Sequence, residues 1–125
     1  MKSGVVLFAH GSRDPEWAVP FRAIERNVAD ALPQAQVELA FLELMQPTLS
    51  AAVDRLVGRA CNRVTIAPLF MAAGAHLKRD LAKLVADISA KHPNVELVAL
   101  PAAGEAPSVM QAIGEWIATT VELKS

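Results

Sequence analysis

Cysteine is almost absent from this 125-residue chain, since Cys61 is the only one. An internal disulfide is therefore impossible, and we expect a reducing, cytoplasmic setting. An excess of charge of one sign is absent too: twelve basic and thirteen acidic residues give a net charge of −1, without a basic run. This argues against nucleic-acid binding. No apolar stretch approaches the roughly 20 residues of a membrane span. The first apolar run ends at His10, too early for a signal peptide.

Hydrophobic residues, in contrast, make up 53% of the chain, and the mean hydropathy is +0.30. A chain of this length corresponds to one domain, so we treat residues 1–125 as a single unit. Such a domain buries roughly two thirds of its unfolded surface, enough for an ordinary core. The apolar excess predicts a buried sheet together with a subunit interface. Nonspecific stickiness is the alternative.

Short apolar runs alternate with amphipathic segments along the chain. The runs predict strands at 2–9, 36–41, 63–70 and 95–100. Apolar residues at a spacing of three and four predict helices over 16–32 and 47–59, a third that opens at His76 and is ended by residues 92–94, and a last one after Pro107. This alternation is typical of βαβ units and a mainly parallel sheet. The first strand is the most continuously apolar, so we expect a flavodoxin-like, three-layer αβα fold with strand order near 2-1-3-4.

Two histidines and one glutamate follow three of the predicted strands. His10 directly follows the first, Glu43 follows the second, and His76 comes one short turn after the third. Open parallel sheets bind ligands at the carboxyl ends of their strands, where the strand order reverses. Two imidazoles and a carboxylate suit Co²⁺, Fe²⁺, Ni²⁺ or Zn²⁺ better than Mg²⁺ or Ca²⁺. We therefore predict a transition-metal site, the alternatives being a structural His10 and a solvent-facing Glu43.

The residues beside these histidines are suited to supporting roles. Gly11 permits a positive φ or a close backbone approach. Ser12 can cap the next helix or bond to the preceding histidine, and Arg13 offers a planar fork for a carboxylate. Asp80 stands one helical turn after His76 and can hold its ring N–H, or it is an ordinary first-turn carboxylate.

Other residues border the predicted cleft. Phe70, Met71 and Met45 either pack as its wall or contact a flat apolar ligand. Lys78 is either solvated or meets an anionic ligand. His92 precedes a proline at a helix end, where a histidine complements the helix dipole and needs no further role.

The motifs His10-Gly11-Ser12-Arg13-Asp14-Pro15, Phe41–Pro47, and Pro68-Leu69-Phe70 with Gly74–Asp80 resemble, in order and spacing, the CbiX-type sirohydrochlorin chelatases of class II. The resemblance is closest to the short form, in which a chain of about half the usual length forms a homodimer. It implies a chelatase-like fold and insertion of a divalent metal into a tetrapyrrole, cobalt for cobalamin or iron for sirohaem. It implies no cofactor beyond the substrate metal.

Residue by residue, His10 and His76 match the family's metal-binding histidines, and Glu43 matches the accompanying acidic residue. We therefore expect these three to be both metal-binding and catalytic, with Glu43 as third ligand or proton acceptor. The residues that we expect around the tetrapyrrole are Gly11, Ser12, Arg13, Phe70, Met71, Gly74 and Lys78. Glycines at 11 and 74 would let a large planar ligand approach closely.

Three other functions remain open. One is a chelatase for a related ring, such as nickel insertion into an amidated sirohydrochlorin. A second is a metal-binding or metal-delivery protein without catalysis. A third is a flavodoxin-like domain for a phosphate-bearing cofactor, disfavoured because no glycine-rich phosphate loop follows the first strand.

Overall fold

The computed structural model describes residues 2–124 of the chain. Its centre is a four-stranded sheet in the order β2-β1-β3-β4, and all three strand pairings are parallel. The strands are β1 (Ser3–Ala9), β2 (Gln36–Phe41), β3 (Arg63–Pro68) and β4 (Glu96–Ala99). The predicted fold class and strand order are confirmed.

Four α-helices and two 3₁₀ turns connect and follow the strands. The helices are α1 (Val19–Ala31), α2 (Leu49–Gly58), α3 (Ala75–Lys91) and α4 (Pro107–Lys124), and the turns are η1 (Pro15–Ala18) and η2 (Ala103–Glu105). Within residues 2–124, no helix combines the length and the apolar character that crossing a membrane requires.

Two predicted helix starts are wrong, each for a local reason. The segment from residue 16 begins as η1, whose first turn Asp14 caps, and becomes α1 only at Val19; Pro20 lies in the first turn of α1, where its missing N–H is tolerated. The second helix begins at Leu49 rather than at Pro47. There the Thr48 hydroxyl accepts a hydrogen bond from the Ala51 N–H at 3.2 Å and caps the helix.

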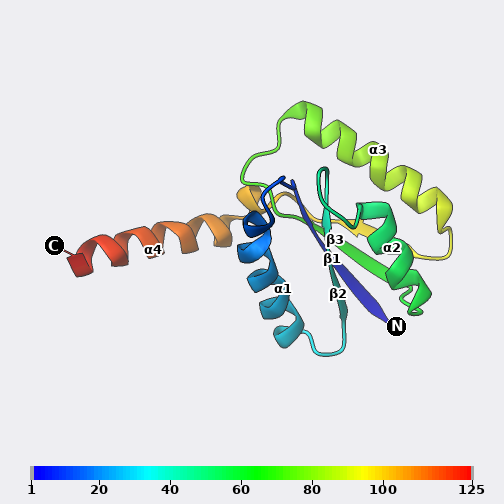
Figure 1. Ribbon diagram of the computed structural model, residues 1–125, viewed down its shortest axis with the longest axis horizontal. Coiled ribbons are helices and arrows are strands. Elements are labelled where there is room, and N and C mark those ends of the chain that lie inside the picture. Colours follow the sequence, from blue (N-terminus) through cyan, green and yellow to red (C-terminus); the bar gives the residue numbers. More distant parts are fainter. Residues whose placement is uncertain (1, 125) are drawn as a thin grey trace.

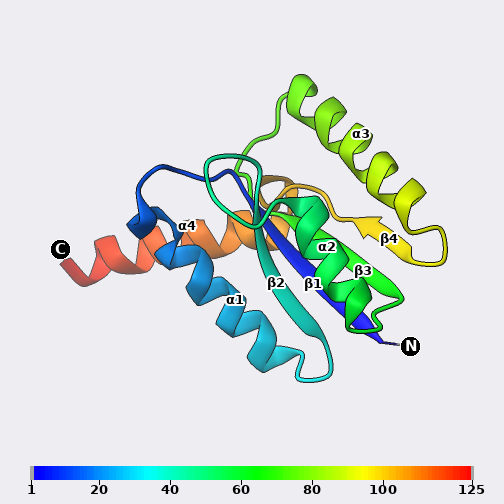
Figure 2. The same ribbon diagram turned by 45° about the vertical axis from the view of Figure 1, so that its right-hand side comes forward.

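The two faces of the sheet are covered unequally (Figures 1 and 2). Helices α2 and α3 pack on one face, over a buried cluster that includes Phe8, Leu56 and Ile66. On the other face α1 packs alone, over a smaller cluster that includes Leu7 and Phe41. The three-layer arrangement is therefore complete on the α2–α3 side only.

Helix α4 does not join these layers. It projects from the body as a separate arm in both views (Figures 1 and 2), and among the described elements it contacts only η2 extensively. Trp116, part of the apolar spacing that predicted this helix, is 67% exposed. The spacing of apolar residues predicts a helix, but it does not show which surface covers the apolar side of that helix.

Candidate metal and active site

Pairing between β1 and β2 continues past the strand ends and brings His10 beside Glu43. The Leu42 N–H donates to the Ala9 carbonyl at 2.9 Å, and the Glu43 N–H donates to the His10 carbonyl at 3.1 Å. These bonds extend the register in which Ala9 faces Phe41. As a result His10 Nε2 lies 3.0 Å from Glu43 Oε1, and both side chains are about half exposed. The two ligand types are held together by the backbone.

The backbone around this pair is tightly constrained. Gly11 has φ +102°, and a Cβ at this position would overlap the carbonyl oxygen of Glu43. Leu44 is held in the left-handed region at φ 66°, and the Met45 N–H donates to the Glu43 carbonyl at 2.8 Å. A non-glycine residue at positive φ is strained, and such residues cluster at functional sites. The expectation of a positive φ and a close approach at Gly11 is confirmed.

Ser12 shapes the loop between β1 and α1. Its Oγ accepts a hydrogen bond from the Asp14 N–H at 3.1 Å, and Asp14 Oδ1 accepts one from the Glu16 N–H at 3.0 Å. Asp14 rather than Ser12 therefore caps the first helical turn. Arg13 is exposed between them.

His76 stands apart from the His10–Glu43 pair. It is the second residue of α3, its side chain is 86% exposed, and its Nε2 lies 3.5 Å from Asp80 Oδ2. Across residues 2–124, no three His, Cys, Asp or Glu side chains converge closely enough to hold a metal ion. The structure thus joins two of the three predicted ligands and leaves the third on a helix end. Gly74, the N-cap of α3, has open space around it.

The Phe70 ring contacts the His10 ring. The two rings meet edge to face with centroids 6.2 Å apart, and Phe70 meets Phe8 in the same way at 5.8 Å. Next to it Met71 is exposed. Gly104 of η2 fixes this segment: its N–H donates to the Phe70 carbonyl at 2.9 Å, and a Cβ there would overlap the Met71 carbonyl. The segment after β3 is therefore clamped by the turn after β4.

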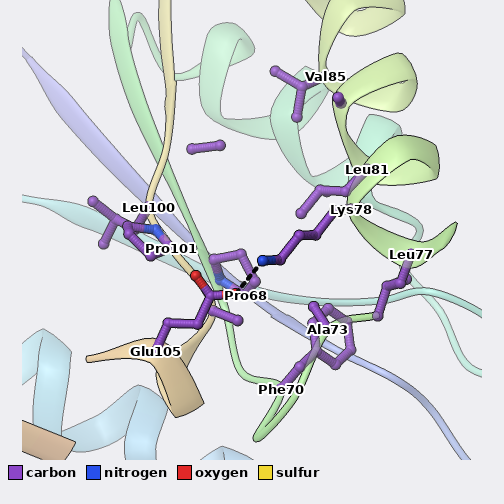
Figure 3. A pocket seen from close by; sticks show the side chains of 13 residues that line it. Pro68, Phe70, Ala73, Leu77, Lys78, Leu81, Val85, Leu100, Pro101 and Glu105 are labelled. Atoms are coloured by element: carbon purple, nitrogen blue, oxygen red, sulfur yellow. Dashed lines mark ion pairs between the residues drawn. The ribbon is translucent and has the colours of Figure 1, made fainter. Parts of the chain in front are cut away.

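A cavity of about 570 Å³ opens beyond Phe70, between the ends of β3 and β4 and helix α3 (Figure 3). Its wall is mostly apolar and includes Pro68, Leu77, Leu81, Val85 and Pro101. The charged pair in this wall joins Lys78 Nζ to Glu105 Oε1 at 3.0 Å. Glu105 was not among the residues predicted for the site; the available signal was an acidic residue in the loop that follows the fourth strand.

A second ionic cluster lies at the opposite end of α3. His92 Nε2 is 2.7 Å from Asp54 Oδ1, and Lys91 Nζ bonds to Asp54 and to Ser50. The hydrogen bond from His92, with that from Lys91, holds the pKa of the Asp54 carboxyl below its ordinary value. His92 therefore has a carboxylate partner in Asp54, which its position at the helix end did not predict.

These features define an α/β protein with a parallel sheet. A histidine–carboxylate pair lies where the inner strand β1 and the edge strand β2 end. The CbiX family model matches residues 4–120. The chain belongs to the CbiX family.

Curated relatives match part of the chain. The sirohydrochlorin cobaltochelatase of Saccharolobus islandicus (strain L.S.2.15 / Lassen #1) is 38% identical over 84 residues, covering 66% of this chain and 62% of that protein. The sirohydrochlorin cobaltochelatase of Sulfurisphaera tokodaii is 34% identical over 88 residues, covering 68% and 69%. The match to the first of these thus spans less than two thirds of the relative's length.

Solved structures share the fold over nearly the whole chain. A cobalamin (vitamin B12) biosynthesis CbiX protein from Marinobacter aquaeolei VT8 superposes with a TM-score of 0.84 at 28% identity, covering 96% of this chain and 98% of that one. The sirohydrochlorin chelatase SirB from Bacillus subtilis subspecies spizizenii, in complex with cobalt, superposes with a TM-score of 0.75 at 24% identity. That match covers 95% of this chain and 51% of SirB.

Proposed function

We propose that this protein is a cytoplasmic sirohydrochlorin chelatase that inserts a divalent metal, Co²⁺ or Fe²⁺, into its tetrapyrrole substrate in cobalamin or sirohaem biosynthesis. Membership of the CbiX family and the names of the curated relatives support the reaction class. The observation that carries the proposal is the pairing of His10 with Glu43 at adjoining strand ends. These are a nitrogen and an oxygen donor at the ligand-binding edge of a parallel sheet.

The separation of the two donor atoms suits a shared cation. Nitrogen and oxygen ligands sit about 2.0–2.2 Å from a first-row metal, so two ligands at right angles are about 3.0 Å apart. His10 Nε2 and Glu43 Oε1 are 3.0 Å apart. A metal ion could therefore replace the proton that the two groups share, with only small movements of their side chains.

His76 is proposed as the third ligand, and the packing of α3 leaves it room to approach. A hollow of about 270 Å³ lies between this helix and the sheet, lined by Phe8 and Leu42 on the sheet side and by Asp80 on the helix. Leu77 and Leu81 face both this hollow and the larger cavity. We expect metal or substrate binding to draw this end of α3 toward the sheet.

Metallation releases two pyrrole protons while the metal exchanges water for ring nitrogens. The proposed ligands hold the metal on one side of the ring, which leaves open positions for the ring nitrogens. Glu43 either remains a metal ligand or accepts one of the released protons. Gly11 keeps the glutamate backbone close to the histidine, so both roles depend on it.

The surroundings of the pair suit a flat ring with peripheral carboxylates. The exposed Met71 offers apolar surface and the buried Phe70 lines the adjoining cavity, while Arg13 and Lys78 offer cations for carboxylates. Lys78 is already paired with Glu105, so a substrate carboxylate would compete with that residue.

A homodimer is part of the proposal. The sheet has four strands, and its carboxyl edge presents the site with both donor side chains half exposed. A second copy facing this edge would enclose a macrocycle better than one copy alone. A chain that stays monomeric at micromolar concentration would contradict this part.

Absorbance-monitored metallation of sirohydrochlorin, with Co²⁺, Fe²⁺ and Ni²⁺ supplied separately, tests the function. We expect insertion of Co²⁺ or Fe²⁺ well above the rate in buffer. Metal binding without acceleration would instead identify a delivery protein. Acceleration only with Ni²⁺ and an amidated ring would identify a chelatase for the related substrate.

A further inference from the structure

The cavity between α3 and the ends of β3 and β4 begins one side chain away from the candidate metal site (Figure 3). Phe70 lines this cavity and also meets the His10 ring edge to face. Leu77, another residue of the cavity wall, directly follows His76 on α3. The cavity thus adjoins both halves of the site without being part of either.

Two charged side chains stand among apolar ones in the wall of this cavity. Lys78 Nζ lies 3.0 Å from Glu105 Oε1, and the other residues that line the cavity are apolar. The two side chains are 58% and 40% exposed, so a ligand can reach both. Glu38, in contrast, is 14% exposed where it bonds to Arg55 and Arg59. Exposed ion pairs add little to stability, so stability alone does not account for the pair at the cavity.

The backbone holds Glu105 in place beside the segment that follows β3. The Gly104 N–H donates to the Phe70 carbonyl at 2.9 Å, and a Cβ at Gly104 would overlap the Met71 carbonyl. Lys78 comes from a different element, the start of α3. The Glu105 carboxylate therefore has a fixed position at the cavity, and the Lys78 ammonium approaches it from the helix (Figure 3).

We propose that the cavity takes one peripheral arm of the tetrapyrrole, and that Glu105 determines how strongly an arm ending in a carboxylate is preferred there to one ending in a carboxamide. The Lys78 ammonium offers only donors, and the Glu105 carboxylate offers only acceptors. A carboxamide has a carbonyl oxygen for Lys78 and an N–H for Glu105, so it can bond to both. A carboxylate has acceptors alone, so it competes with Glu105 for Lys78. This inference rests on the proposed chelatase function and adds a specificity-determining residue to it.

The two members of the pair have opposite effects on a carboxylate arm. Lys78 attracts it, whereas Glu105 repels it from a position 3.0 Å from the same ammonium group. A carboxamide gains a charge-assisted hydrogen bond from each side chain and meets no repulsion. Removal of either charge should therefore change the preference between the two kinds of arm, and the two removals should change it in opposite directions.

A purely structural role for the pair leads to a different expectation. The pair joins the start of α3 to η2 and could serve only to hold these two elements together (Figure 3). Such a link is lost whichever of the two charges is removed. Both variants would then change the binding of every ring by the same factor. The direction of the change thus separates recognition of an arm from support of the fold.

Equilibrium dialysis of metal-free rings measures this preference without relying on metal insertion. The two ligands are sirohydrochlorin and the same ring with all its carboxylates converted to carboxamides, so that whichever arm enters the cavity is changed. We expect wild type to bind both rings. Glu105→Gln should shift the ratio of the two dissociation constants about fivefold in favour of sirohydrochlorin, because a neutral side chain no longer repels a carboxylate yet still accepts from an amide.

Lys78→Met removes the other charge and keeps an apolar side chain in the cavity wall. It should shift the same ratio about fivefold in favour of the amidated ring, because Glu105 still accepts from an amide but now repels a carboxylate without compensation. Glu96→Gln is the matched control. Glu96 forms an exposed ion pair with Arg63 where β3 and β4 begin, at the opposite edge of the sheet, so its loss should leave the ratio unchanged. Circular dichroism checks that all three variants are folded.

Three results would overturn the proposal. Shifts of Glu105→Gln and Lys78→Met in the same direction would show a structural role, and unchanged ratios would show that no arm enters the cavity. Failure of wild type to bind the amidated ring would show that the pair does not accept a carboxamide. Co²⁺ insertion is measured separately. The expected shifts without accelerated insertion would support this inference and refute the proposed activity, whereas insertion with unshifted ratios would do the reverse.

Discussion

The two halves of the candidate site are built in different ways. At the ends of β1 and β2, backbone hydrogen bonds and a glycine with φ +102° fix His10 against Glu43. At the start of α3, His76 is largely exposed, and Asp80, 3.5 Å from its ring, is its one acidic partner within residues 2–124. The first half is held in place by these backbone contacts, whereas His76 stands on the exposed first turn of α3. We expect such a site to bind a metal ion at the first half before the second half closes on it.

Substitution of one glycine in each half compares most directly how tightly the two halves of the site are constrained. Gly11→Ala forces a Cβ into the Glu43 carbonyl at a positive φ, so we expect a loss of about 1–3 kcal/mol in unfolding free energy, plus displacement of Glu43. Gly74→Ala meets open space at the N-cap of α3 and should cost less than about 1 kcal/mol. Urea denaturation of both variants measures the difference. Equal losses would mean that the first half is no more constrained than the second.

The affinity for Co²⁺, measured without tetrapyrrole, should differ between variants of the two histidines. His10→Ala removes a proposed ligand from the pair, and we expect Co²⁺ binding to weaken by tenfold or more, since even outer partners of metal ligands are worth about 10–100-fold. His76→Ala should change this affinity by less than threefold, because His76 is not assembled with the pair. Calorimetric titration with Co²⁺ measures both. If His76→Ala costs as much as His10→Ala, the free protein already holds all three ligands together.

Variants of the Lys78–Glu105 pair test the cavity beside the His76 half of the site. Glu105→Gln frees Lys78 for a substrate carboxylate and should lower the KM for sirohydrochlorin up to about fivefold, the range of an exposed ion pair. Lys78→Ala should raise the KM by a similar factor. Steady-state metallation measures both variants. A KM that moves in the same direction in the two variants would show that the pair matters for structure rather than for substrate.

The Asp54 cluster, remote from both halves, should give the smallest effect. Its pKa is lowered in the folded protein, so ionised Asp54 stabilises the fold at neutral pH, and this contribution disappears as pH falls below 3.8 and through the folded value. Because the Asp54 side chain is about half exposed, Asp54→Asn should cost about 0.5 kcal/mol or less at pH 7. Thermal unfolding of both proteins from pH 7 to pH 2 checks this. We expect the difference in Tm between wild type and Asp54→Asn to shrink toward acid. A difference that grows toward acid would contradict this prediction.

The sequence was most informative where chemistry depends on local spacing. The apolar runs located four strands and their order, and a histidine or glutamate after a strand pointed to the sheet edge. Gly11 was expected to allow a positive φ or a close backbone approach, and its φ of +102° agrees with this. Parallel register then brings His10 and Glu43 together without any further information.

Features that depend on how elements pack were not accessible in this way. The spacing of Trp116 and Ile117 predicted a helix, but not that α4 leaves its own sheet uncovered. The distance of His76 from the pair depends on how closely α3 approaches the sheet, and no local pattern encodes that distance. The partner of Lys78 comes from a turn more than twenty residues later in the chain.

Absorbance-monitored insertion of Co²⁺ into sirohydrochlorin, by wild type, His10→Ala, Glu43→Gln and His92→Ala, tests the central claim most directly. His92 is the matched control: it is the C-cap residue of α3, at the opposite end of that helix from His76, and is paired with Asp54. We predict that His10→Ala and Glu43→Gln reduce insertion to the rate in buffer while remaining folded, and that His92→Ala retains wild-type rates. Wild-type insertion by His10→Ala and Glu43→Gln would contradict the account.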